Sequence, residues 1–241
     1  MIYSDTWADP QKQYLPAAWP TTLHPLARTL RKYVRDTLTS FQKANIDLAI
    51  VSLGNEIRHG MLWPVGRANV DVQPWSKTVA NFSNLAVLYS AARAGVEDVA
   101  YDLSHRPQVM IHVDNGWNLT LQQRWFGALI ANGVKTDAWD VFGFSFYPFY
   151  GTAATFANLK TSLNAIANKY KKPMQVVETD YPAICNGQWN PIPESSEPEI
   201  GYNVEGQLVW MKNVIKVVRE VPYGLGQGVC DHSLGFGTSL L

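Results

Sequence analysis

The chain has 241 residues, enough for one large domain or two small ones, and 46% of them are hydrophobic. Twenty Lys and Arg balance twenty Asp and Glu, which argues against the charged surface that binds nucleic acid or anionic membranes. Nine Trp, eleven Tyr and nine Phe suit an uncharged partner with flat apolar faces, such as a sugar, although core packing explains them about equally well.

Segments in which apolar residues recur with the period of a helix alternate along the chain with short apolar runs typical of strands. Residues 25–44 place apolar side chains at helical spacing, and the apolar run within residues 47–54 predicts a buried strand. The remaining helices are predicted over residues 79–95, 119–133, 155–171 and 204–220, and the remaining strands over residues 108–113, 141–147, 174–177 and, less clearly, 223–229. Residues 2–4 are expected to form a short strand stub. In the last helix, Leu208, Met211, Ile215 and Val218 are expected on one apolar face.

This alternation is typical of a parallel sheet covered by helices. Two architectures fit it, a (β/α)8 barrel and a doubly wound open sheet. No Gly-rich phosphate-binding loop follows any predicted strand, which favours the barrel. Barrels of this kind carry their chemistry at the carboxyl ends of the strands, so the candidate site is sought there.

Polar and aromatic residues follow four of the predicted strands. The first strand runs into Asn55 and Glu56, and the strand over residues 174–177 runs into Glu178. The two glutamates are 122 positions apart, yet both are expected at the mouth of the barrel. A single glutamate at a strand end is more often half of an ion pair, but a pair in these settings favours catalysis. Two carboxyl groups flanking one site are what hydrolysis of a glycosidic bond requires, and a retaining enzyme separates them by about 5–5.5 Å.

Other residues at the strand ends suit sugar binding. The amide of Asn55 is able to hydrogen-bond a sugar hydroxyl, and the hydroxyl of Tyr147 either holds the nucleophile in line or, with its ring on Phe149, only packs. His112 is expected to bind sugar or to pack in the barrel, because no second His or Cys stands at metal-ligand spacing; no metal or cofactor is expected. The remaining candidates for substrate contact are Asp5, Trp7, Trp63, Asp114 and Trp117.

Long motifs resemble one family over about residues 2–226. The segments SDTWADP (4–10), SLGNEIRHGMLWPVG (52–66), MIHVDNGW (110–117), FGFSFYPFY (142–150) and VVETDYP (176–182) are similar to those of the endo-β-1,4-galactanases of glycoside hydrolase family 53, especially the fungal ones. The resemblance implies an α/β fold of the (β/α)8 TIM barrel type. It also implies retaining cleavage of the β-1,4-galactan side chains of pectin, type I arabinogalactan. By resemblance, Glu56 is the acid/base and Glu178 the nucleophile.

The resemblance further implies that the barrel is incomplete. Against the family pattern, the first two strands are missing and the eighth is doubtful, so residues 1–241 are expected to form one partial catalytic barrel domain. We expect the complete form to be secreted and monomeric, although this chain carries no signal peptide. Expressed alone, the chain is expected to be insoluble or inactive, because its sheet would have bare edges. Pairing of Cys185 with Cys230 and glycosylation at Asn81 and Asn118 stay open.

Two alternatives remain open at this point. One is another retaining endo-glycanase on the same barrel that acts on xylan or mannan. The other is a non-catalytic, galactan-binding remnant of the barrel. Release of reducing ends from galactan, xylan and mannan distinguishes the three functions.

Overall fold

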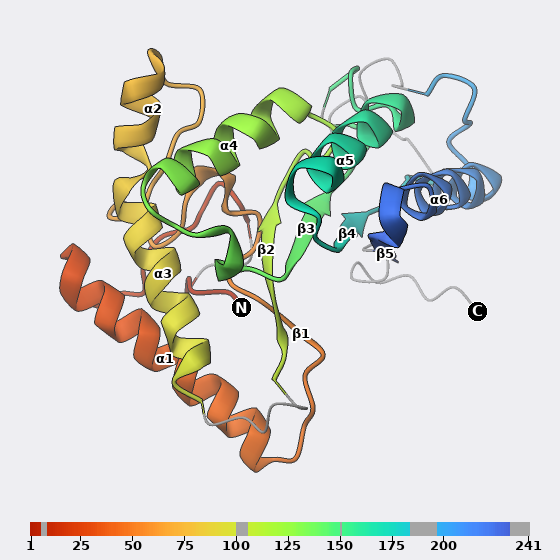
Figure 1. Ribbon diagram of the computed structural model, residues 1–241. Helices are drawn as coiled ribbons and strands as arrows, with labels where there is room; N and C mark the ends of the chain where they lie inside the picture. The colour runs from red at the N-terminus through yellow and green to blue at the C-terminus, as the bar shows by residue number, and fades with distance from the viewer. Residues whose placement is uncertain (6–8, 100–105, 150, 184–196, 232–241) are drawn as a thin grey trace. The chain divides into compact units, whose positions relative to one another are not determined.

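The computed structural model describes residues 1–5, 9–99, 106–149, 151–183 and 197–231 (Figure 1). Two residues singled out in the sequence, Trp7 and Cys185, lie outside these ranges. The chain divides into two compact units. Unit 1 consists of Met1–His112 and Arg124–Val141, and unit 2 of Val113–Gln123 and Phe142–Leu241.

The elements alternate between helix and strand, as predicted. The helices are α1 (Leu23–Lys43), α2 (Trp75–Asn81), α3 (Ser83–Glu97), α4 (Leu119–Ala131), α5 (Phe156–Tyr170) and α6 (Val204–Arg219). The strands are β1 (Ile50–Ser52), β2 (Gln108–Val113), β3 (Val141–Ser145), β4 (Met174–Thr179) and β5 (Gly226–Asp231).

The sheet is parallel and its strands follow the order β1-β2-β3-β4-β5. This order confirms the predicted α/β class, since each strand is joined to its parallel neighbour by a helical crossover. The doubtful last strand exists as β5, which pairs with β4 from Gly226 opposite Met174 onward.

In unit 1, α1 and α3 pack side by side (Figure 1). The face of α1 that carries Leu26, Leu30 and Val34 is fully buried, as the helical spacing predicts. A Cβ atom on Gly95 of α3 would lie 2.5 Å from the backbone oxygen of Arg31, so only glycine allows the helices to approach this closely.

Two predictions for unit 1 are wrong in detail. The helix expected over residues 79–95 is two helices, α2 and α3, which meet at the buried Phe82; α2 begins directly after Pro74, a residue that favours helix starts. Residues 2–4 do not form the expected strand stub. Tyr3 instead inserts into the core with 6% of its surface exposed.

In unit 2, α5 and α6 pack together and α6 lies against β4 and β5. Of the four residues expected on one apolar face of α6, Val218 is buried but 56% of Leu208 is exposed. The other large side chains of α6 that are buried are Trp210, Val214 and Val217. The helix therefore turns its Trp210 side toward the sheet, where the indole fills more volume than leucine would.

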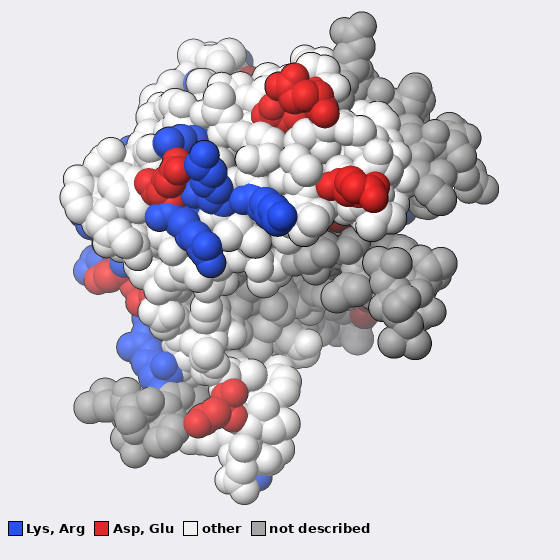
Figure 2. Space-filling view, turned by 90° about the vertical axis from the view of Figure 1, so that its right-hand side faces the viewer, with Lys and Arg blue, Asp and Glu red and all other residues white. Residues whose placement is uncertain are grey.

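The surface carries no extended patch of one charge in the view of Figure 2. Basic side chains lie beside acidic ones there, and most of that face carries neither sign. This agrees with the balanced composition. Among the described helices, none is both long and apolar enough to cross a membrane.

Candidate active site

The carboxyl end of β1 leads into a tight turn that carries Glu56. Gly54 has a φ of 106°, and Glu56 itself adopts the left-handed conformation with φ 45° and ψ 52°. A non-glycine residue in this region costs roughly 1–2 kcal/mol, and such conformations concentrate at functional sites. The turn leaves 8% of Glu56 exposed, so its carboxyl group is almost wholly surrounded by protein.

His112, near the end of β2, contacts the same turn. Its Nδ1 accepts a hydrogen bond from the backbone N–H of Glu56 at 3.4 Å, and only 3% of the side chain is exposed. An accepting Nδ1 places the proton of the neutral imidazole on Nε2. In unit 1 the structure thus brings together Asn55, Glu56 and His112, all named from the sequence.

The segment over residues 13–15 braces this turn from outside the sheet. Nε2 of Gln13 donates to the backbone oxygen of Asn55 at 2.6 Å, and the backbone oxygen of Gln13 accepts from the N–H of Trp63 at 2.7 Å. Gln13 is therefore hydrogen-bonded to both Asn55 and Trp63 in the loop that follows β1.

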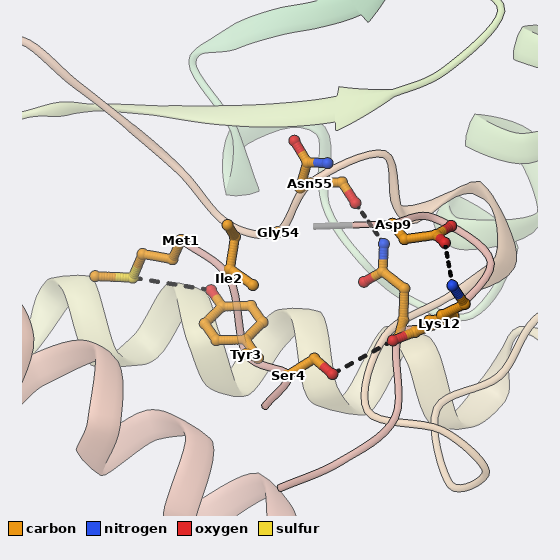
Figure 3. A pocket seen from close by; sticks show the side chains of 9 residues that line it. Met1, Ile2, Tyr3, Ser4, Asp9, Lys12, Gly54 and Asn55 are labelled. Carbon is orange, nitrogen blue, oxygen red and sulfur yellow. Dashed lines mark hydrogen bonds and ion pairs between the residues drawn. The ribbon is translucent and has the colours of Figure 1, made fainter. Parts of the chain in front are cut away.

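The hollow between the N-terminal residues and the turn is too small for a sugar. Figure 3 shows Gly54 and Asn55 on one side of it and Tyr3, Ser4 and Lys12 on the other. Its volume is about 10 Å³, which is space for a single water molecule. This hollow is therefore part of the support of the turn and no substrate site.

Trp63 lies within the same loop but is 4% exposed. Its ring meets Tyr14 edge-on at 5.6 Å, the guanidinium of Arg67 lies 4.8 Å from its centroid, and its Nε1 donates to the backbone oxygen of His59 at 2.8 Å. Stacking of Trp63 on a sugar stays a prediction. Asp5 is exposed and accepts a hydrogen bond from the N–H of Ala17 at 3.1 Å.

In unit 2, Glu178 stands near the end of β4 beside two hydroxyl groups. The phenol of Tyr147 donates to Oε2 of Glu178 at 3.1 Å, and the hydroxyl of Ser145 hydrogen-bonds the same carboxyl group. The ring of Tyr147 also lies against Phe149, with centroids 5.2 Å apart, so Tyr147 both bonds Glu178 and packs on Phe149, and its role in holding a nucleophile stays a prediction.

The surroundings of Glu178 act on its pKa in opposite directions. Burial disfavours the charged carboxylate and raises the pKa above the ordinary value of 4.5, while the hydrogen bonds from Tyr147 and Ser145 lower it. The negative charges of Asp114 and Asp180 raise it again. The net result is a raised pKa, with burial as the largest cause.

Two further candidates lie in unit 2. Asp114 is 8% exposed and acts on Glu178 through its charge. Trp117 is half-buried, and its Nε1 has no hydrogen-bond acceptor among the residues that the structure describes.

Ser145 was missed in the sequence, although one feature marks it. It is the only polar residue of β3 and all other residues of that strand are apolar or glycine. A hydroxyl at the end of such a strand is buried and needs a partner, which Glu178 supplies here.

Comparison with known proteins decides the family. The model of glycosyl hydrolase family 53 matches residues 1–231. The chain belongs to this family. The fold also matches a solved structure described as one of two fungal β-1,4-galactanases, with a TM-score of 0.83, 36% identity, and coverage of 95% of this chain and 64% of that one. This match confirms the barrel-type fold expected from the sequence.

Curated family 53 members include close relatives from fungi. An arabinogalactan endo-β-1,4-galactanase of Thermothelomyces thermophilus is 39% identical over 225 residues, and one of Humicola insolens is 38% identical over 229 residues. In both comparisons 93% of this chain aligns with 64% of the relative. The chain therefore spans somewhat less than two thirds of the length of these family 53 relatives.

Proposed function

We propose that the protein is an endo-acting, retaining glycoside hydrolase that cleaves β-1,4-galactosidic bonds in type I arabinogalactan. The observation that carries this proposal is the setting of Glu178, a partly buried carboxyl group held by the hydroxyls of Tyr147 and Ser145 at a strand end. Two hydroxyl donors fix the direction of a carboxylate that must attack along one line. The names of the fungal relatives supply the choice of galactan.

In the first step, Glu178 attacks the anomeric carbon and Glu56 donates a proton to the departing glycosidic oxygen. The part of the galactan chain beyond the cleaved bond leaves as an alcohol. The part that carries the anomeric carbon remains bound to Glu178 as an ester. In the second step, Glu56 takes a proton from water, whose oxygen attacks the anomeric carbon and releases Glu178 as the carboxylate.

The roles of the two glutamates are proposed from the resemblance to family 53. The hydrogen bonds from Tyr147 and Ser145 favour the ionised form of Glu178, which the nucleophile needs, although burial keeps its pKa raised. Glu56, the proposed acid/base, has 8% of its surface exposed. The retaining mechanism requires the two carboxyl groups to lie about 5–5.5 Å apart, a prediction that a crystal structure of the protein tests.

The other residues are proposed to bind substrate. Asn55 is proposed to bond the sugar 2-hydroxyl, and Trp117 to stack on a sugar ring. The remaining proposed contacts are Asp5, Trp7, Trp63, His112, Asp114 and Tyr147. We also propose that the complete protein is secreted and monomeric.

Covalent labelling tests the nucleophile directly. A 2-deoxy-2-fluoro-β-galactoside with a dinitrophenolate leaving group is incubated with the complete form of the protein, and the digested protein is analysed by mass spectrometry. We expect the fluorosugar on the peptide that contains Glu178. Attachment elsewhere contradicts the assignment.

Polysaccharide hydrolysis tests the substrate and the alternatives. Release of reducing ends from galactan, but not from xylan or mannan, is the expected result. In the complete form of the protein, Glu178→Gln should abolish release, whereas Glu56→Gln should still expel the leaving group of an activated aryl galactoside, which needs little acid assistance. Binding of galactan by folded protein without any release would favour the non-catalytic alternative.

A further inference from the structure

Thr179 and Trp210 form a buried polar pair behind the strand end that carries Glu178. Nε1–H of Trp210 donates to Oγ1 of Thr179 at 2.8 Å, and neither side chain has exposed surface. Thr179 is the last residue of β4 and Trp210 belongs to α6, so this bond joins the helix layer to the strand. Since successive side chains of a strand point to opposite faces, holding Thr179 on the helix side directs Glu178 to the other side.

The register of β4 against β3 explains why such a bond is needed. Phe144 of β3 lies opposite Val176, but the next residue, Ser145, lies opposite Glu178. One residue of β3 therefore faces two of β4 at this step. Such a bulge bends the strand and re-aims a side chain, and it leaves a residue outside the regular pairing.

The same irregularity exists on the other side of β4. Val176 lies opposite Val229 of β5, and Thr179 lies opposite Asp231. Three steps along β4 correspond to two along β5. The segment of β4 that holds Glu178 is thus out of regular pairing with both β3 and β5. The hydrogen bonds between the strands alone therefore do not fix the direction of the Glu178 side chain.

The ring of Trp210 reaches the neighbouring strand end as well. It stacks on Phe146 with centroids 5.0 Å apart and planes at 11°, and the backbone N–H of Phe146 donates to the backbone oxygen of Glu178 at 2.9 Å. Phe146 precedes Tyr147, the residue that donates to the Glu178 carboxyl group. Trp210 therefore contacts Thr179, which follows Glu178, and Phe146, which precedes Tyr147.

We propose that Thr179 and Trp210 are positioning residues that hold the bulged end of β4 so that Glu178 stays within reach of Tyr147 and Ser145. Neither residue is proposed to touch substrate. That Glu178 is the nucleophile rests on the proposed function, but the positioning itself is a property of the folded chain and is testable without substrate.

The test is an NMR titration of the Glu178 carboxyl group in the complete form of the protein, labelled with ¹³C at the glutamate side chains. Its resonance is assigned by its loss in Glu178→Gln. Thr179→Val keeps the shape of the side chain but lacks the hydroxyl, and Trp210→Phe keeps an aromatic ring but lacks the N–H. We expect each to raise the pKa of Glu178 by about half a unit, because loosened bonds from Tyr147 and Ser145 no longer favour the carboxylate.

Matched variants separate positioning from general loss of stability. Thr179→Ser retains the hydroxyl and should leave the pKa unchanged. Thr78→Val removes the hydroxyl of another fully buried threonine, which bonds the backbone oxygen of Val72 in unit 1, and should also leave it unchanged. The double variant Thr179→Val with Trp210→Phe should shift the pKa no further than either single change, since both remove one bond.

Two results would overturn the proposal. Near-ultraviolet circular dichroism first shows which of Thr179→Val and Trp210→Phe is folded. One overturning result is an unchanged pKa of Glu178 in a folded variant. The other is an equal shift in Thr78→Val. This titration does not depend on hydrolysis of galactan. The proposed activity and the positioning role of Thr179 and Trp210 can therefore be contradicted independently.

Discussion

The phenol hydroxyl of Tyr147 donates a hydrogen bond to Oε2 of Glu178 at 3.1 Å, across the step from β3 to β4. Within the same unit, Asp114 acts on this carboxyl group with the opposite sign, through its negative charge. Glu178 is therefore held between one group that favours its ionised form and another that disfavours it. This balance gives two predictions of opposite direction.

Tyr147→Phe should raise the pKa of Glu178 further. The lost bond favours the carboxylate, and a hydrogen bond to a charged group contributes about 1.5–3 kcal/mol, so a rise of about one to two units is expected. Since the nucleophile acts in its ionised form, the acidic limb of the pH profile of kcat/KM should move to higher pH by the same amount. Phe149→Leu, which alters the ring contact of Tyr147 but removes no hydroxyl, is the control; an unmoved limb in Tyr147→Phe would contradict the assignment.

Asp114→Asn should lower the pKa of Glu178 and move the acidic limb to lower pH. The amide has the shape of the carboxyl group but no charge, so the repulsion that disfavours ionised Glu178 is lost. The position of the limb is the measurement, because the absolute rate also reflects any contact of Asp114 with substrate. A shift toward higher pH would show that Asp114 acts on Glu178 by some other route.

The strand ends that carry the site were predictable from the sequence. Strands β1 to β4 are mostly apolar and lead into polar residues, and β2 to β5 were located to within a few positions. The buried face of α6 was not predictable from period alone. Both the stripe through Leu208 and the stripe through Trp210 are apolar, and only packing against the sheet decides between them.

The supports of the site were harder to predict than its charged residues. Glu56 and Glu178 stand out as carboxyl groups after apolar strands. Ser145, Thr179 and Trp210 depend on a change of register in β4, and register is set by pairing between strands distant in sequence. No local pattern in the sequence marks that change.

Gln13→Glu should weaken the brace on the turn that carries Glu56. The new carboxylate has no hydrogen to donate and would place an oxygen about where Nε2 now lies, 2.6 Å from the backbone oxygen of Asn55. Loss of the bond and the new repulsion should lower the free energy of unfolding by about 1–3 kcal/mol, measured by urea denaturation. Gln11→Glu, an exposed neighbour, adds the same charge and should change stability by less than about 0.5 kcal/mol. Equal losses in the two variants would mean that charge, and not the brace, is responsible.

Gly54→Ala should destabilise the protein more than Gly133→Ala, although both glycines have a positive φ. The φ angles are 106° at Gly54 and 87° at Gly133, so alanine is strained at either position by about 1–2 kcal/mol. At Gly133 nothing lies within 4 Å of the added Cβ atom, whereas at Gly54 it would lie 2.4 Å from Cγ2 of the fully buried Ile57. Overpacking of a buried side chain adds about 1–3 kcal/mol, so the difference between the variants in urea denaturation should be of this size. Equal unfolding free energies would show that Ile57 moves without cost and that the turn before Glu56 does not depend on the absence of a side chain at Gly54.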